Sequence, residues 1–135
     1  MAVTVYKSFP FLTVYWDDSF NGVLMEWKGS SQRGEQIKQG LDAGLELLIQ
    51  KKSACWLANI KELSVFSQDT QDWINEDWFP RFLSSSATKM AVIAPVNFVA
   101  QLSVLAVMRT ASGTNLNVQY FSGIEAARAW IMASS

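Results

Sequence analysis

The sequence predicts an α/β fold, a mostly parallel sheet with helices packed on it, from three observations. Residues 54–60, Ala-Cys-Trp-Leu-Ala-Asn-Ile, form a nearly all-apolar run without charge. Such a run is typical of a strand in a parallel sheet that is covered by helices on both faces. A long helical pattern precedes this run, and a serine-capped helix follows it. Of the 135 residues, 50% are hydrophobic and 17% are charged, which suits one domain with a sizeable core. We therefore expect a single domain over residues 1–135, organised around a central strand at 54–60.

An antiparallel hairpin is expected at the start of the chain. Residues 11–16 are rich in β-branched and aromatic side chains, which favours a strand. Residues 23–27 return as its partner after Asn21-Gly22, a dipeptide typical of tight turns. Residues 3–7 are either an extra edge strand or a lead-in to the hairpin.

A helix is expected over residues 32–51, after Gly29-Ser30-Ser31 has closed the hairpin and capped it. Apolar residues recur along it at helical spacing, with charged and amide residues on the opposite face. Gly40 and Gly44 each weaken such a helix by about 1 kcal/mol relative to alanine. We expect these two glycines to allow a close approach to the sheet.

Three strand–helix units are expected from the central strand onward. Ser67 caps the first helix, and Pro80 ends it. A buried strand at 90–94 leads into a helix at 98–110 that is apolar almost all round, so it is expected to be buried on more than one side.

The last unit is a strand at 117–121 followed by a helix with a Ser122–Glu125 capping box. Its apolar residues, which we expect to pack on the sheet, are Ile124, Ala127, Trp130 and Ile131. The predicted order is ββαβαβαβα, with a mixed, mostly parallel five-stranded sheet.

Composition excludes several classes of function. Eleven basic and twelve acidic residues give a net charge of -1, which predicts no nucleic-acid partner. The chain has no histidine, so Ser-His-Asp and Cys-His catalysis and most zinc sites are excluded, and no cofactor or metal is expected. The single cysteine, Cys55, is expected as a small buried hydrophobe, which suits a reducing, cytoplasmic location. Residues 1–16 do not have the pattern of a signal peptide.

Residues 90–108 carry no charge, and their length falls in the range of a membrane span. Pro95 interrupts this segment near its start, and Asn97, Gln101 and Ser103 add polar groups. A buried strand, a turn and a buried helix explain it better, so no membrane span is expected.

Acidic residues gather in two places where they suggest chemistry. Asp69, Asp72, Glu76 and Asp77 follow Ser67, but four acids on one helix are more often a solvated face than a cation site. In the hairpin, the acid–base candidates are Asp17, Asp18 and Glu26. Nothing in the sequence sets a pair of them at catalytic distance, and Asp17-Asp18 more simply starts a turn.

Five short stretches carry a resemblance to a known family. They are Trp-Leu-Ala-Asn-Ile-Lys-Glu-Leu at 56–63, Ser67 opening a helix, Trp73-Ile74, Trp78-Phe79-Pro80, and Lys-Met-Ala-Val-Ile at 89–93. With the element order, they resemble the STAS fold of anti-sigma-factor antagonists. The chain is more closely similar to the small bacterial SpoIIAA-like (STAS/SEC14-like) proteins, over residues 11–132. The resemblance implies a single SpoIIAA-like domain.

In regulatory members of that fold, a phosphorylated serine follows the central strand in an Asp-Ser-Ser-Gly type of motif. The corresponding stretch here is Glu-Leu-Ser-Val-Phe-Ser at 62–67, which lacks the aspartate and the glycine. The resemblance makes Ser64 or Ser67 the phospho-switch position. From the residues alone, Ser67 is favoured as a plain helix cap.

Two functions remain from the sequence. The first is a non-enzymatic binding or regulatory module that acts through protein–protein interaction as a homodimer, with Phe98, Leu102 and Leu105 as interface residues. The second is a carrier or sensor of an apolar small molecule or lipid, which the SEC14 resemblance and the six Trp, three Tyr and eight Phe suggest. The expected ligand-lining residues are Trp73, Trp78 and Phe79. An enzyme is a remote third alternative.

Overall fold

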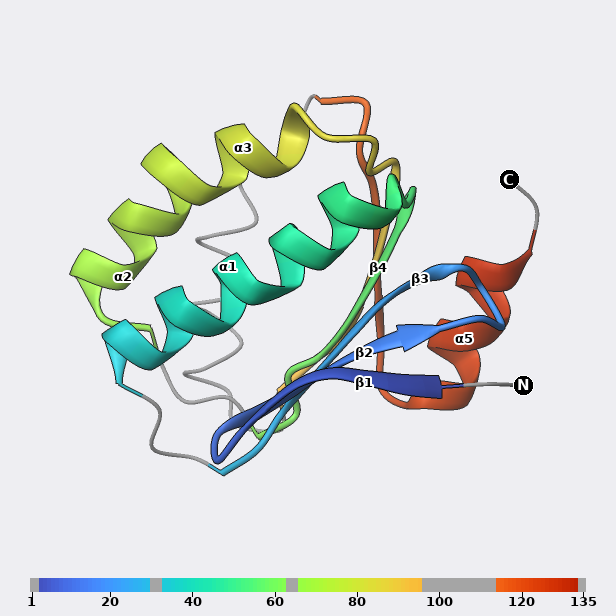
Figure 1. Ribbon diagram of the computed structural model, residues 1–135, viewed down its shortest axis with the longest axis horizontal. Coiled ribbons are helices and arrows are strands. Elements are labelled where there is room, and N and C mark those ends of the chain that lie inside the picture. Colours follow the sequence, from blue (N-terminus) through green and yellow to red (C-terminus); the bar gives the residue numbers. More distant parts are fainter. Residues whose placement is uncertain (1–2, 30–32, 63–65, 96–113, 134–135) are drawn as a thin grey trace.

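The computed structural model describes residues 3–29, 33–62, 66–95 and 114–133, which form an α/β fold in three layers (Figure 1). The middle layer is a six-stranded sheet whose strands lie in sequence order. The strands are β1 (Val3–Phe9), β2 (Leu12–Asp17), β3 (Gly22–Trp27), β4 (Cys55–Asn59), β5 (Lys89–Ile93) and β6 (Asn117–Phe121). The helices are α1 (Gly34–Lys51), α2 (Gln68–Trp73), the π-helix η1 (Ile74–Trp78), α3 (Phe79–Leu83) and α5 (Ile124–Met132).

The sheet is mixed. Strands β1, β2 and β3 pair antiparallel, and β3, β4, β5 and β6 pair parallel. The expected central strand is confirmed as β4, which lies between β3 and β5. Its side chains alternate between two cores, with Trp56 and Ala58 on one face and Leu57 on the other. This two-sided burial explains why the run at 54–60 is apolar without a polar alternation.

The prediction of five strands was wrong, because residues 3–9 form a sixth strand at the edge. Strand β1 pairs with β2, and the register shifts between Val5 and Lys7. None of its side chains is buried, and the alternation that begins with Val3 and Val5 is lost at Lys7, so the strand has only a weak sequence signal. The bulge brings both Tyr6 and Lys7 over α1, where each contacts Glu46.

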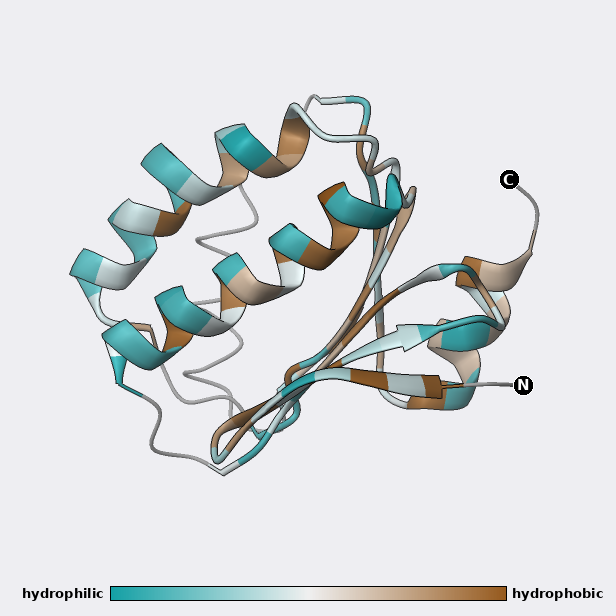
Figure 2. Cartoon of the chain, viewed as in Figure 1, coloured by the Kyte–Doolittle hydropathy of each residue, from teal (hydrophilic) through white to brown (hydrophobic). Residues whose placement is uncertain are grey.

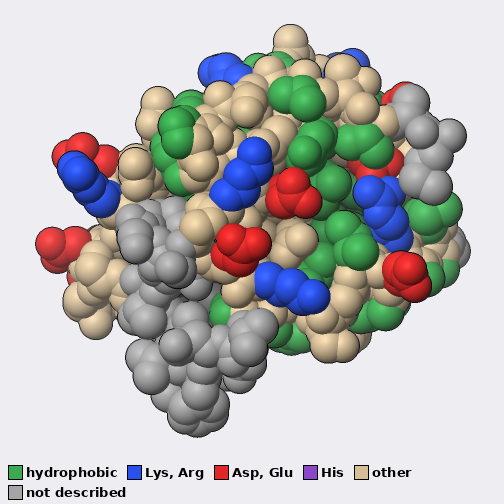
Figure 3. Space-filling view, turned by 90° about the horizontal axis from the view of Figure 1, so that it is seen from below, with side chains coloured by type: hydrophobic (Ala, Val, Ile, Leu, Met, Phe, Trp, Pro, Cys, Tyr) green, Lys and Arg blue, Asp and Glu red, His purple; other side chains and the backbone are tan. Residues whose placement is uncertain are grey.

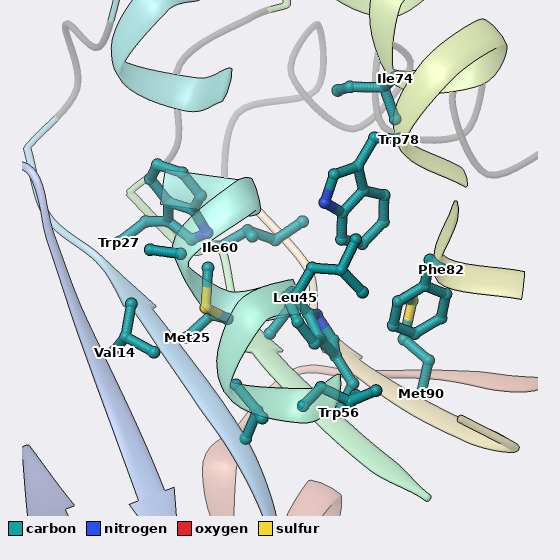
Figure 4. Close-up of a cluster of buried hydrophobic side chains, with 14 of the residues drawn as sticks. Val14, Met25, Trp27, Leu45, Trp56, Ile60, Ile74, Trp78, Phe82 and Met90 are labelled. Atoms are coloured by element: carbon teal, nitrogen blue, oxygen red, sulfur yellow. The ribbon is translucent and has the colours of Figure 1, made fainter. Parts of the chain in front are cut away.

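The larger core lies between the sheet and the helices α1, α2, η1 and α3 (Figure 4). Hydrophilic and hydrophobic residues alternate along α1, as expected of a helix with one face on the sheet (Figure 2). The expected close approach is confirmed. A Cβ on Gly40 would lie 2.5 Å from Leu12 Cδ2, and one on Gly44 would lie 2.5 Å from Met25 Sδ.

The prediction that Pro80 ends the helix after β4 was wrong. Helix α2 continues through η1 into α3, and the last helical residue is Leu83. The amide of Phe79 donates to the carbonyl of Ile74, five residues back. This wider turn lets the chain continue through Pro80, which has no amide hydrogen to donate.

Helix α5 covers the second face, where Ala127 and Ile131 are buried and Ile124 and Trp130 pack at the margin, as expected. Two predicted caps were wrong. The N-cap of α5 is Gly123 without a side-chain bond, so the Ser122–Glu125 capping box does not form. Helix α1 is preceded by Arg33, whose amide donates to Gln36 Oε1 at 2.9 Å, two residues later than the serines suggested.

Several predictions lie outside the described residues. They concern the helix at 98–110, its interface candidates Phe98, Leu102 and Leu105, and Ser64. Of the segment at 90–108, residues Met90–Ile93 belong to β5. Within the described ranges, no helix combines the length and the apolar character that crossing a membrane requires.

Candidate functional site

The aromatic residues expected to line a ligand pocket lie in or beside the larger core. The Trp78 ring stacks on Phe82 with centroids 4.9 Å apart and meets Trp56 edge-on at 5.4 Å. Its indole nitrogen donates to the carbonyl of Leu41 at 3.0 Å, which satisfies the one polar group of the side chain. Phe79 is 1% exposed and packs edge-on to Trp78. These rings therefore fill the space between the helices and the sheet.

Trp73 differs from the other two because it is only half-buried. The ammonium of Lys38 lies 5.6 Å from its ring centroid, and the guanidinium of Arg81 lies 5.8 Å away. Two cations within about 6 Å of one ring are in cation–π range. Trp73 therefore lies where α1 and α2–η1–α3 meet at the surface.

An open groove runs between α1 and α3, with a volume of about 760 Å³. Its apolar residues are Leu45 and Ile49 from α1 and Pro80 from α3. Leu45 is buried, but Ile49 is 54% exposed, one of the few large apolar side chains at the described surface. The polar residues at its edges are Asp42, Glu46, Arg81, Ser84 and Ser85. The groove thus combines an apolar floor with a charged rim.

Ion pairs hold the rim charges in place. Arg81 bridges the two helices, with Nη2 at 2.8 Å from Asp42 Oδ1 and Nε at 2.9 Å from Asp77 Oδ1. Glu46 accepts hydrogen bonds from the Tyr6 hydroxyl at 2.5 Å and from Lys7 Nζ at 3.4 Å. The Tyr6 hydrogen bond, and then the Lys7 charge, lower the pKa of Glu46 below its ordinary value. The Glu46 carboxylate therefore keeps its negative charge near neutral pH.

Ser67, the phospho-switch candidate within the described residues, is exposed and caps α2. Its Oγ accepts from the amide of Thr70 at 3.2 Å and lies 2.9 Å from Thr70 Oγ1. The prediction of Ser67 as a helix cap is confirmed. The switch itself stays a prediction.

The hairpin carboxylates suggested for acid–base chemistry have structural partners. Asp17 is fully buried, and its Oδ2 lies 2.5 Å from Arg128 Nη1 of α5. Its Oδ1 accepts from the amide and the hydroxyl of Ser19 at 2.9 and 2.6 Å. Asp18 accepts from Trp16 Nε1 at 2.8 Å, and Glu26 from the Tyr15 hydroxyl at 3.3 Å. These contacts tie the β2–β3 turn to α5 and the two strands to each other.

The acidic residues after Ser67 are spread over α2 and η1. Asp72 accepts from Gln68 Nε2 at 2.9 Å, and Asp77 pairs with Arg81. Asp69 and Glu76 are exposed. Within the described ranges, no three Cys, Asp or Glu side chains are placed to hold a metal ion together.

Cys55 is half-buried at the start of β4, beside α5. Burial raises the pKa of its thiol, and the charge of Lys89 opposes this shift. Lys89 is held by α5, because its Nζ donates to the carbonyls of Trp130 and Ala133 at 3.0 and 2.9 Å. Since the thiolate is disfavoured at this position, Cys55 lacks the environment of a reactive cysteine.

On the face shown in Figure 3, hydrophobic side chains lie among basic and acidic side chains, so charges of both signs are interspersed with apolar surface. Comparison with known protein families, with curated proteins and with solved structures returned no match. The α1–α3 groove is therefore the candidate site on geometry alone. It includes Ile49, Arg81 and Ser85, which the sequence did not single out.

Proposed function

We propose that this chain is a non-enzymatic binding or regulatory module that acts through protein–protein interaction. The open groove between α1 and α3 is the observation that carries the proposal. Its floor exposes Ile49, and a charged rim surrounds it. A hydrophobic centre within a polar rim is the usual anatomy of a protein–protein interface.

The chemistry of the groove indicates the kind of segment that it would bind. An apolar side chain of the partner would cover Ile49, which is 54% exposed, and would remove this apolar surface from water. On the α1 side, Asp42 and Glu46 lie one helical turn apart and pair with Arg81 and Lys7, so the rim presents charges of both signs to a partner. The groove is open to solvent, so it suits a protein segment better than a ligand that must be enclosed.

The resemblance to SpoIIAA-like proteins supports the same class of function, and we propose that the chain belongs to that family and forms a homodimer. The engagement of Asp17, Asp18 and Glu26 in structural contacts supports a non-enzymatic role. Asp17 links the β2–β3 turn to α5 and Glu26 links β3 to β2, whereas Asp18 makes a local contact with Trp16.

A carrier of an apolar small molecule is the second candidate. The groove volume of about 760 Å³ falls within the range of small-molecule pockets. Native mass spectrometry of the freshly purified protein separates the two. A mass of twice the 15.1 kDa chain without an adduct favours the dimeric module. A reproducible extra mass of small-molecule size favours the carrier.

The groove is tested by comparing two matched surface variants. Ile49→Arg places a charge on the groove floor. Met132→Arg places the same charge outside the groove, on α5, at a residue of similar exposure. In quantitative crosslinking from the host extract, a protein captured by the wild type should bind Ile49→Arg about tenfold or more weakly, as when a central apolar anchor is lost. Capture by Met132→Arg should be unchanged. Equal capture by all three proteins would show that the groove is not the binding surface.

A further inference from the structure

Strand β6 is the last strand of the sheet and lacks the features that normally protect a sheet edge. Among the described residues it pairs with β5 alone, in an uninterrupted register. Its sequence, Asn-Val-Gln-Tyr-Phe, contains no charge and no proline. The opposite edge, β1, has both a bulge and Lys7. Bulges and lysines are the usual means of blocking edge-to-edge pairing, so of the two edges in the described part of the sheet it is β6 that lacks this protection.

The hydrogen-bonding pattern shows which groups of β6 face outward. The amide of Asn117 donates to Thr88 and the carbonyl of Phe121 accepts from Ala94, both toward β5. In a parallel ladder, alternate residues point their amide and carbonyl to the same side. Val118 and Tyr120 therefore point theirs away from β5.

We propose that two copies of this chain pair antiparallel through β6, with Gln119 opposite Gln119 of the second copy at the two-fold axis. This register pairs all five residues of the strand. It sets the outward groups of Val118 opposite those of Tyr120 of the second copy, as a hydrogen-bonded antiparallel pair requires. The two sheets then continue into one another.

The side chains that meet in this register are complementary. Tyr120 is 43% exposed and would pack beside Val118 of the second copy, an aromatic and β-branched pair of the kind that stabilises sheets. The two Gln119 side chains, which are exposed in the single chain, would each offer an amide donor and acceptor to the other. No like charges face each other, so the strand is self-complementary, as a two-fold interface demands.

This inference rests on the proposed function as a homodimeric module and specifies the surface that the dimer uses. A five-residue strand pair is a small interface, so we expect a weak dimer whose population rises with protein concentration. Gln119 lies in a non-hydrogen-bonded pair, where opposite side chains come closest. Charges introduced there should therefore have a large effect.

The test uses two charge variants, Gln119→Lys and Gln119→Glu, and their mixture. Each variant alone places like charges on the two-fold axis and should be monomeric by native mass spectrometry and light scattering. The mixture should form a heterodimer at wild-type concentrations or below, because lysine then faces glutamate. Thr4→Lys, an exposed position on the protected β1 edge, is the control and should leave the wild-type dimer intact. Thermal melting should show all variants folded, because Gln119 is exposed.

The outcomes separate the interface from the function. Dimers in both single variants would overturn pairing through β6 but leave a homodimer through another surface. A wild type that is monomeric up to its solubility limit would overturn the β6 dimer and the homodimer together. If both single variants are monomeric and their mixture forms no heterodimer, then the two residues at position 119 do not face each other at a two-fold axis. That result would also overturn the proposal.

Discussion

Gly44→Ala is a sharp test of how closely α1 lies against the sheet, because two effects of opposite sign compete. Alanine is the better helix former, and in a helix interior it stabilises by about 1 kcal/mol relative to glycine. Against this, a Cβ on Gly44 would lie 2.5 Å from Met25 Sδ and 2.6 Å from Trp56 Cη2. Met25 and Trp56 are 0% and 2% exposed, so neither side chain can turn into solvent.

The packing effect should be the larger of the two. Forcing an extra carbon into a filled core costs about 1–3 kcal/mol. The thioether of Met25 can yield more easily than the indole of Trp56, which places the cost near the middle of that range. We expect a net loss of about 1 kcal/mol, which is a fall in melting temperature of about 3–5 °C for a domain of this size. Gly40→Ala meets Leu12 and Trp27 instead. Because the two glycines lie one helical turn apart, one shift of α1 can relieve both clashes, so the double variant should lose less than the sum of the two single losses.

Urea unfolding followed by tryptophan fluorescence measures this loss, and Gly123→Ala is the matched control. A Cβ at Gly123 would meet nothing within 4 Å, and its backbone is extended, so Gly123→Ala introduces no packing clash and loses only the preference for glycine over alanine at this N-cap, less than about 1 kcal/mol. A Gly44→Ala protein that is more stable than the wild type by about 1 kcal/mol would show helix propensity acting alone. The close packing of α1 on β3 and β4 would then be refuted.

Two further predictions concern the layer formed by α5. Arg128→Ala leaves the buried carboxylate of Asp17 without its cation and should cost about 3 kcal/mol in urea unfolding, whereas Arg81→Ala, which breaks exposed pairs, should cost less than about 1 kcal/mol. Equal losses would contradict the burial of the Asp17 pair. The raised pKa of Cys55 means that less thiolate is present at a given pH in the folded protein, so iodoacetamide should modify it more slowly than in the urea-unfolded chain. Equal modification rates in the folded and the unfolded chain would contradict the burial of Cys55 beside α5.

Local patterns in the sequence were sufficient to predict most of the fold. The uncharged run around Trp56 identified a strand buried on both faces, and the spacing of Gly40 and Gly44 identified the helix face nearest the sheet. The predictions failed where the structure depends on backbone hydrogen bonding that the side-chain pattern does not indicate. Strand β1 forms with no buried side chain, and a π-turn carries the helix past Pro80.

The groove was harder to predict because it arises from the packing of two helices. Asp42 and Arg81 are 39 residues apart in the sequence and meet only because α1 and α3 lie side by side. Helical spacing places Ile49 on α1, but periodicity does not give the position of the neighbouring helix. Trp78 was predicted to line a ligand pocket because it is aromatic, whereas in the structure its ring packs on Trp56 and Phe82 in the core.

The absence of charged residues and proline from a strand can be interpreted only when the position of that strand in the sheet is known. The absence of charge and proline in β6 is visible in the sequence, but the same is true of the buried strand segment Cys55–Asn59. Strand order separates them, because β4 has neighbours on both sides whereas β6 has β5 on one side only among the described residues. An uncharged central strand is required by its burial, whereas an uncharged edge strand leaves backbone donors and acceptors open to pairing. The proposed pairing of two copies through β6 would use this open edge, whereas the bulge and the lysine protect the edge at β1 from pairing.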